Sequence, residues 1–243
     1  MSIRNRNIHS LTHAVLSYLE KSKDHSIGVR LALRRLSDMN LSLAQIIDTK
    51  PVGTRHQIIL DEAINEIDHP SLDNIALKLK EAKEYLVWRE DNNNYYDKGA
   101  DLGEGYRKCN LHTVLIGPDA CGYYNNDFIL GFFMLGPWTL YRDHRHPAPE
   151  LYLNLSNRSG FRLKSQDWHD HSAGSFVWNE ANSLHAIRVY EKPFISIFIW
   201  LENIEHPCIV VPVNDWAKVE ANLKNRSYAS VRLKNLARNR PED

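Results

Sequence analysis

The sequence has few cysteines and no excess charge of either sign. Only Cys109, Cys121 and Cys208 occur among its 243 residues, and they form no Cys-x-x-Cys pair. Three cysteines cannot all pair within one chain, so we expect no disulfide framework and a reduced, cytoplasmic setting. The 30 Lys and Arg residues balance the 30 Asp and Glu residues. Zero net charge argues against a protein dedicated to nucleic acid or to a membrane surface.

Long hydrophobic runs are also absent. No apolar segment approaches the roughly 18 residues that a membrane helix requires, and the start Met1-Ser-Ile-Arg lacks the apolar core of a signal peptide. We therefore expect neither membrane insertion nor export. The chain also contains no Gly-rich phosphate loop and no Gly-x-Ser-x-Gly elbow. Its 43% hydrophobic content is enough for one good core.

What is present divides the chain into regions of different character. In the N-terminal region, residues 1–95, apolar residues recur at helical spacing, as in Leu11, Val15 and Leu19 and again between residues 75 and 86. This pattern predicts three or four amphipathic helices. They could cap the remainder of the protein or build a homodimer, and the pattern suits either role.

The composition and hydrophobic pattern of the sequence change after residue 95. Short apolar runs rich in aromatic and β-branched residues, separated by Gly, Asn and Asp, fill residues 96–213. No helix-length segment lies between these runs, so they predict a β-barrel rather than a parallel sheet. The fold class is thus expected to be mainly β, with a C-terminal helix and tail over residues 214–243.

A group of potential metal ligands lies in the barrel region. His144, His146 and Glu150 occur close together, and His185 follows at a distance. Imidazole and carboxylate are ligands that first-row divalent metals prefer. Alternate side chains of an extended segment share a face, so His144 and His146 should point the same way. A neighbouring strand would supply His185, after a turn in which Asn182 can adopt positive φ. The spacing predicts three or four ligands around one cation inside the barrel.

The spacing His-x-His-x-x-x-Glu, followed on a later strand by a single His, resembles the two cupin motifs over roughly residues 110–212. It implies a cupin-like β-barrel, a double-stranded β-helix, preceded by the helical region. The stretch 132–156, the later His185-Ala-Ile-Arg and the strand ending in Trp200 look more narrowly like the cupin-type dimethylsulfoniopropionate (DMSP) lyases. That family also has a helical N-terminal part before its barrel.

The resemblance implies roles for individual residues. Three positions match the family's metal ligands: His146, Glu150 and His185. Three more match residues of its substrate pocket: His144, Tyr141 and Trp200. Tyr152 matches a metal-proximal tyrosine that is proposed as the base.

The implied activity is that of a carbon–sulfur lyase, which cleaves DMSP to dimethyl sulfide and acrylate by base-promoted β-elimination. A divalent metal on the substrate carboxylate would offset the negative charge that develops as the neighbouring proton leaves. A phenol has a pKa of about 10 and becomes a useful base only beside a cation. We therefore expect Tyr152 to be the base, with Tyr141 as the competing candidate, while His144 could bind either the metal or the substrate carboxylate.

The substrate is expected to be a small zwitterion, and its sulfonium end has no hydrogen-bond donors. Aromatic faces attract such a cation. Trp200 and Tyr141, with Trp178 or Trp138, could form this wall. The sequence does not single out one divalent transition metal, because Fe, Mn, Co, Ni and Zn all suit mixed imidazole and carboxylate sites.

Two other interpretations remain open. One is a cupin enzyme that acts on another small carboxylate, as an isomerase or dioxygenase. The other is a nonenzymatic metal-binding sensor with the helices as its interaction module, although the first hundred residues lack a basic helix-turn-helix signature. A second His-rich segment, 168–171, has no partner cluster and is expected to be a solvated loop.

Overall fold

The computed structural model describes residues 2–91, 95–156, 158–164 and 166–238. Helices fill its first part, where the sequence pattern placed them: α1 (Ile3–Lys21), α2 (Ile27–Ser37), η1 (Leu43–Gln45), α3 (Gln57–Asn65), η2 (Pro70–Leu72), α4 (Asp73–Ala82) and η3 (Lys83–Tyr85). The short helix α5 (Glu104–Lys108) leads into the strands. A long C-terminal helix, α6 (Trp216–Arg238), follows them. The chain therefore has mixed α and β content.

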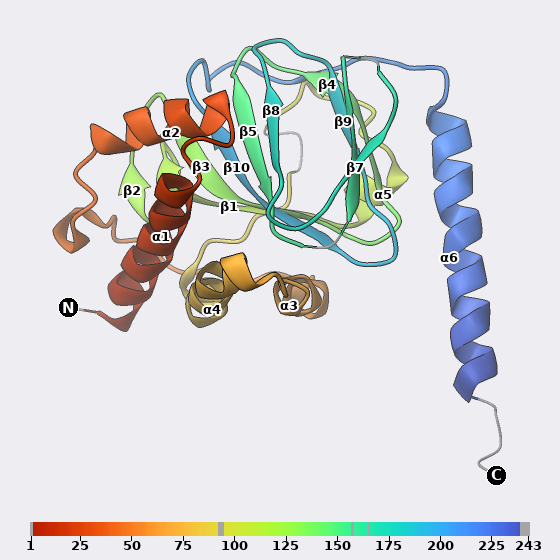
Figure 1. The fold of residues 1–243 in the computed structure, drawn as a ribbon, viewed down its shortest axis with the longest axis horizontal. Helices are drawn as coiled ribbons and strands as arrows, with labels where there is room; N and C mark the ends of the chain where they lie inside the picture. The colour runs from red at the N-terminus through yellow and green to blue at the C-terminus, as the bar shows by residue number, and fades with distance from the viewer. Residues whose placement is uncertain (1, 92–94, 157, 165, 239–243) are drawn as a thin grey trace.

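The strands form two sheets that face each other in a barrel (Figure 1). One sheet has the order β2-β1-β3-β10-β5-β8 and the other β11-β4-β9-β6-β7. From β3 onward the chain passes back and forth between the sheets, as a double-stranded β-helix requires, so the predicted barrel is confirmed. The strands are β1 (Asn110–Gly117), β2 (Tyr123–Tyr124), β3 (Ile129–Leu135), β4 (Leu140–Arg145), β5 (Glu150–Asn154), β6 (Ser159–Leu163), β7 (His169–His171), β8 (Phe176–Asn179), β9 (His185–Arg188), β10 (Phe194–Trp200) and β11 (Ile209–Val210).

The six-stranded sheet is buried on both faces, and strand β10 shows the consequence for its sequence. Phe194, Phe198 and Trp200 belong to the cluster of side chains inside the barrel. Ile195 and Ile197, which alternate with them, belong to the cluster on the outer face. Because both faces need apolar side chains, such a strand is a continuous apolar run rather than an alternating one.

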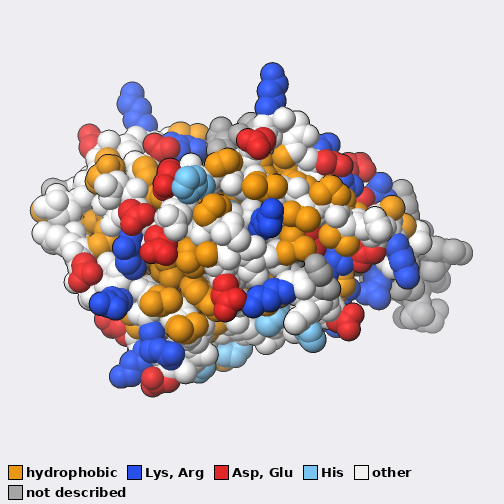
Figure 2. Space-filling view, turned by 90° about the horizontal axis from the view of Figure 1, so that it is seen from above, with side chains coloured by type: hydrophobic (Ala, Val, Ile, Leu, Met, Phe, Trp, Pro, Cys, Tyr) orange, Lys and Arg blue, Asp and Glu red, His pale blue; other side chains and the backbone are white. Residues whose placement is uncertain are grey.

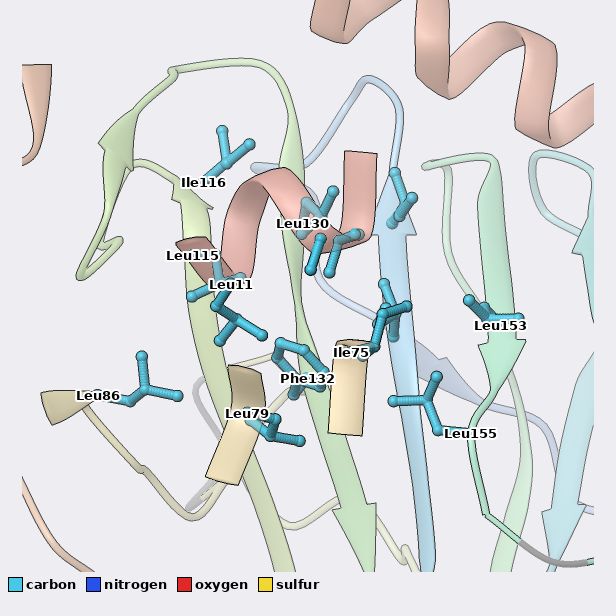
Figure 3. Close-up of a cluster of buried hydrophobic side chains, with 14 of the residues drawn as sticks. Leu11, Ile75, Leu79, Leu86, Leu115, Ile116, Leu130, Phe132, Leu153 and Leu155 are labelled. Atoms are coloured by element: carbon cyan, nitrogen blue, oxygen red, sulfur yellow. The ribbon is translucent and has the colours of Figure 1, made fainter. Parts of the chain in front are cut away.

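The N-terminal helices cover the outer face of this sheet (Figure 1). Figure 3 shows Leu11 of α1 and Ile75 and Leu79 of α4 meeting the sheet beside Phe132 of β3. All four side chains are almost completely buried. Burying a side chain of this size stabilises the fold by about 2 kcal/mol. The helices and the outer face of the six-stranded sheet thus form one hydrophobic core.

Helix α6 stands beside the barrel on the side away from α1 (Figure 1). It lies within residues 214–243, where the sequence pattern predicted a C-terminal helix and tail. The start of this region is attached to the five-stranded sheet by ion pairs. Arg142 of β4 donates to both carboxylate oxygens of Glu220, at 2.9 and 3.0 Å, and Arg162 of β6 donates to Asp215 at 2.6 Å.

The surface matches the balanced composition of the chain. On the face shown in Figure 2, basic and acidic side chains are interspersed, and no large area carries one sign of charge. No helix within the described ranges is long and apolar enough to cross a membrane. The expectation of a loop at residues 168–171 is wrong in part, because His169–His171 forms strand β7, which pairs with the edge of β6.

Candidate metal centre and active-site cavity

The candidate metal ligands come together between the two sheets. His144 lies on β4 directly opposite His185, the first residue of β9, in the register of that strand pair. Glu150 begins β5 in the other sheet. His146 lies in the connection between β4 and β5, that is, between the sheet that carries His144 and His185 and the sheet that carries Glu150. The predicted convergence of the three histidines on one place is confirmed.

The turn before β9 positions its histidine. Asn182 adopts a left-handed conformation with φ of 59°, as the sequence suggested for this turn. Its backbone N–H donates to the carbonyl oxygen of His146 at 2.8 Å. This bond connects the turn that carries His185 to the segment that carries His146, so the two ligands are held together by the backbone.

Hydrogen bonds fix the orientation of all three imidazole rings. Each ring bonds through Nδ1 to a backbone carbonyl oxygen two residues away, at 2.8 Å in His144, 2.8 Å in His146 and 2.9 Å in His185. A carbonyl oxygen can only accept, so each Nδ1 must carry the proton. In the neutral ring, each Nε2 then presents a lone pair. This arrangement is common among metal-binding histidines.

These atoms fit a divalent cation. One potential ligand atom from each histidine lies within 4.8 Å of the others, and all three rings are buried. Within the described part of the chain, Nε2 of His185 has no hydrogen-bond partner, although it lies 3.2 Å from Oε2 of Glu150. A buried polar atom without a partner is costly, and a bound cation would satisfy it.

The electrostatics give the protonation states that a metal requires. Burial, and then the neighbouring His185 and His146, lower the pKa of His144 well below its ordinary value, so its ring is neutral. Burial alone would raise the pKa of Glu150, but the adjacent imidazoles of His146 and His185 outweigh burial and lower it. A neutral imidazole and an ionised carboxylate are both ready to bind a metal.

Two further side chains hold the carboxylate of Glu150. Trp200, opposite Glu150 on β10, donates from Nε1 to Oε1 at 2.8 Å. Asn179, opposite Glu150 on β8, donates from Nδ2 to Oε2 at 3.3 Å. The sequence analysis included Trp200 but missed Asn179, because only the strand register reveals that it lies beside Glu150.

A small cavity adjoins this cluster at Glu150, and the centre of a water-sized molecule can move through about 40 Å³ of it. Aromatic side chains dominate its lining: Asp91, Tyr95, Tyr96, Tyr106, His112, Phe133, Tyr141, Glu150, Tyr152, Phe198, Trp200 and Cys208. A mostly apolar cleft with a few convergent polar groups is typical of small-molecule sites. The cavity contains both candidate base tyrosines and the carboxylate of Glu150.

The two tyrosines differ in their surroundings. Tyr152 lies on β5 two residues after Glu150, and burial, followed by the charge of Glu150, raises its pKa well above the ordinary value. The ring of Tyr141 stacks on His144, with centroids 4.1 Å apart. Its hydroxyl is hydrogen-bonded to the hydroxyl of Tyr96. Tyr141 is therefore already engaged by another side chain.

The structure places Trp200 in the cavity and two other candidate wall residues elsewhere. The ring of Trp200 lies 4.5 Å from that of His146. Trp178 packs on the outer face of the sheet, where a Cβ added to Gly28 of α2 would lie 2.4 Å from its ring. Trp138 packs near α6 with Leu140 and its neighbours. Neither Trp178 nor Trp138 lines the cavity.

One wall of the cavity could not be predicted from the sequence. Asp91, Tyr95, Tyr96 and Tyr106 come from the segment that precedes the first strand, and His112 comes from β1. The high aromatic content of this segment was the available signal. Its placement against the barrel depends on the path of an irregular loop, which hydrophobic periodicity does not reveal.

Solved structures with this fold include two DMSP lyases. A chain from the crystal structures of the DMSP lyases RdDddP and RnDddQII superposes with a TM-score of 0.65 at 17% identity, over 87% of this chain and 100% of that chain. DMSP lyase DddQ from Ruegeria pomeroyi DSS-3 gives a TM-score of 0.61 at 16% identity, over 83% of this chain and 96% of DddQ. At these identities the likeness shows the fold alone.

Sequence comparison supplies the family. The curated DMSP lyase DddQ of Ruegeria pomeroyi is 27% identical over 109 residues, which cover 44% of this chain and 53% of DddQ. This chain thus spans about half the length of the curated relative that it matches. The sequence model of the dimethylsulfoniopropionate lyase family matches residues 25–196, a segment that includes every candidate ligand. Because the match covers more than half of the chain, the protein belongs to the dimethylsulfoniopropionate lyase family.

Proposed function

We propose that the protein cleaves DMSP into dimethyl sulfide and acrylate by β-elimination. A base removes a proton from the carbon next to the carboxylate, and the electron pair left behind forms the carbon–carbon double bond. The carbon–sulfur bond breaks, and sulfur leaves with its electron pair as neutral dimethyl sulfide. One observation carries the proposal: in a member of this family, a buried three-histidine cluster adjoins an aromatic cavity that also contains a tyrosine.

The cluster would hold one divalent transition metal through Nε2 of His144, His146 and His185 and the carboxylate of Glu150. The bonds from each Nδ1 to a backbone carbonyl leave these nitrogens free to bind it. A bound cation would offset the negative charge that grows on the substrate carboxylate during proton removal. His144 is the member of the set that could instead donate a hydrogen bond to that carboxylate, after rotation of its ring.

Tyr152 is the proposed base. Without a cation nearby, burial and Glu150 keep its hydroxyl protonated, because both raise its pKa. A positive charge at the adjacent cluster acts in the opposite direction and favours the phenolate. The hydroxyl of Tyr141 already has a partner in Tyr96, so Tyr141 is the second candidate.

The sulfonium end of the substrate would lie against the aromatic wall of the cavity. Trp200 and Tyr141 contribute aromatic side chains to this wall, and Phe133 and Phe198 extend it. Attraction between a cation and an aromatic face needs no hydrogen-bond donor on the ligand. It would orient the leaving group away from the cluster.

The proposal is tested by incubating the metal-loaded protein with DMSP and measuring headspace dimethyl sulfide together with acrylate in solution. We expect both products in equal amounts, and no release by protein treated with a chelator until a divalent metal is restored. Consumption of oxygen, or an isomer formed without volatile sulfide, would instead support an oxygenase or isomerase acting on another carboxylate. A protein that binds metal but converts none of these substrates would support a sensor.

A further inference from the structure

The cavity contains a second carboxylate, which the proposed elimination does not use. Asp91 is buried and lines the same cavity as Tyr152 and Trp200. It belongs to the segment before the first strand, whereas Glu150 belongs to the barrel. The cavity therefore carries two acidic groups, one beside the histidine cluster and one from the segment before β1.

Hydrogen bonds hold Asp91 in place. The hydroxyl of Tyr106 donates to Oδ2 at 3.0 Å, and the backbone N–H of Tyr95 donates to Oδ1 at 3.4 Å. The backbone N–H of Asp91 donates in turn to the side-chain oxygen of Asn110 at 2.7 Å. These bonds hold the carboxylate at the cavity wall, where its charge can interact with whatever occupies the cavity.

The two residues that donate to Asp91 also have aromatic side chains that line the cavity. Tyr95 meets the ring of Trp200 edge to face, with centroids 5.7 Å apart. Tyr106 stacks on Tyr141 at 4.5 Å. Asp91 and Glu150 both line this cavity, so a bound molecule would lie near both carboxylates.

We infer that Asp91 and the rings of Tyr95, Tyr106 and Trp200 form a cation subsite, which selects substrates carrying a permanently charged sulfonium or quaternary ammonium group. This inference rests on the proposed function for the assignment of the substrate carboxylate to the histidine cluster. A dialkylsulfonium group has no donor that a polar side chain could recognise. Its charge is the property that distinguishes it from a hydrocarbon of the same shape, and a carboxylate with aromatic faces responds to that charge.

The test compares two ligands of the same shape that share a carboxylate and differ in charge. They are 3-(trimethylammonio)propanoate, which has a permanent cation, and 4,4-dimethylpentanoate, which has a neutral tert-butyl group. Dissociation constants are measured by calorimetry on the full, metal-loaded chain. We expect the cationic ligand to bind at least about tenfold more tightly, the effect of roughly one charge contact.

Asp91→Asn removes the charge while keeping an oxygen that can accept the bond from Tyr106. We expect it to reduce the preference for the cation at least about fivefold and to leave binding of the neutral ligand nearly unchanged. Asp119→Asn is the matched control, since Asp119 is an exposed acid near Tyr95 that does not line the cavity. This control should keep the full preference. Should Asp91→Asn fail to fold, Tyr95→Leu must lower the preference by removing an aromatic face.

Two results would overturn the inference: equal binding of the two ligands by the parent protein, or an unchanged preference in Asp91→Asn. Neither result depends on turnover. A protein that shows the preference but releases no dimethyl sulfide would refute the proposed function and leave the cation subsite standing. A protein that cleaves DMSP but binds the two ligands equally would refute the cation subsite and leave the proposed function standing.

Discussion

Replacement of Trp200 with Phe should weaken metal binding without removing a ligand. The indole Nε1 donates to Oε1 of Glu150 at 2.8 Å, and a phenyl ring keeps the aromatic surface but has no donor. A hydrogen bond to a charged group is worth about 1.5–3 kcal/mol. Asn179 would still hold the other oxygen, at 3.3 Å. Loss of a group that orients a ligand typically lowers metal affinity about 10- to 100-fold, which matches this energy.

The assay is a competition between the protein and a chelator for Zn²⁺, with the metal-free protein as the starting point. Trp178→Phe is the matched control, because Trp178 lies on the outer face of the sheet against α2. We expect Trp200→Phe to lose at least about tenfold in affinity and the control to retain the parent value. If Trp200→Phe bound Zn²⁺ within about threefold of the parent, the claim that Trp200 positions Glu150 as a metal ligand would be refuted.

Three further predictions concern the base, a buried ion pair and a buried histidine. Tyr152→Phe should keep its metal but lose at least about 100-fold in turnover, whereas Tyr141→Phe should lose less; the reverse order in the headspace assay would reassign the base. Arg162→Met leaves the fully buried Asp143 without its ion-pair partner, so urea denaturation should show a loss of about 3 kcal/mol. Burial lowers the pKa of His112 from 6.5 to about 4. Between these pH values the unfolded chain binds a proton that the folded chain excludes, so the free energy of unfolding should fall by up to about 3 kcal/mol as the pH drops, and His112→Phe should flatten this dependence.

The ligand cluster could be predicted from the sequence because its members occur in two short motifs. The alternation of His144 and His146 predicted their common direction: β4 carries His144, and His146 follows directly after the last residue of that strand, with both histidines in one cluster. The left-handed turn at Asn182 could also be predicted, since asparagine tolerates that conformation. Local sequence rules are sufficient where the geometry itself is local.

The position of Trp178 could not be predicted in the same way. In the β5–β8 pair, Glu150 lies opposite Asn179 and Leu151 opposite Trp178. A shift of one residue in this register would exchange the two faces of the strand and bring Trp178 toward the cavity. Composition cannot distinguish the two registers when both faces of the sheet are buried.

The wall formed by Asp91, Tyr95 and Tyr106 could not be predicted from the sequence, for another reason. These residues lie between the helices and the barrel, in a segment without regular periodicity. Their contacts with β4 and β10, such as the stacking of Tyr106 on Tyr141, join residues far apart in the chain. Only the folded arrangement shows that they complete the cavity.

The most direct test of the metal centre is a crystal structure of the protein loaded with Mn²⁺, with an anomalous difference map to locate the ion. We expect one strong peak between the two sheets, within coordination distance of Nε2 of His146 and His185 and of the carboxylate of Glu150. A map with no peak there, or with Mn²⁺ bound only at other sites on the protein, would contradict the account of a buried metal centre and remove the basis for the proposed elimination.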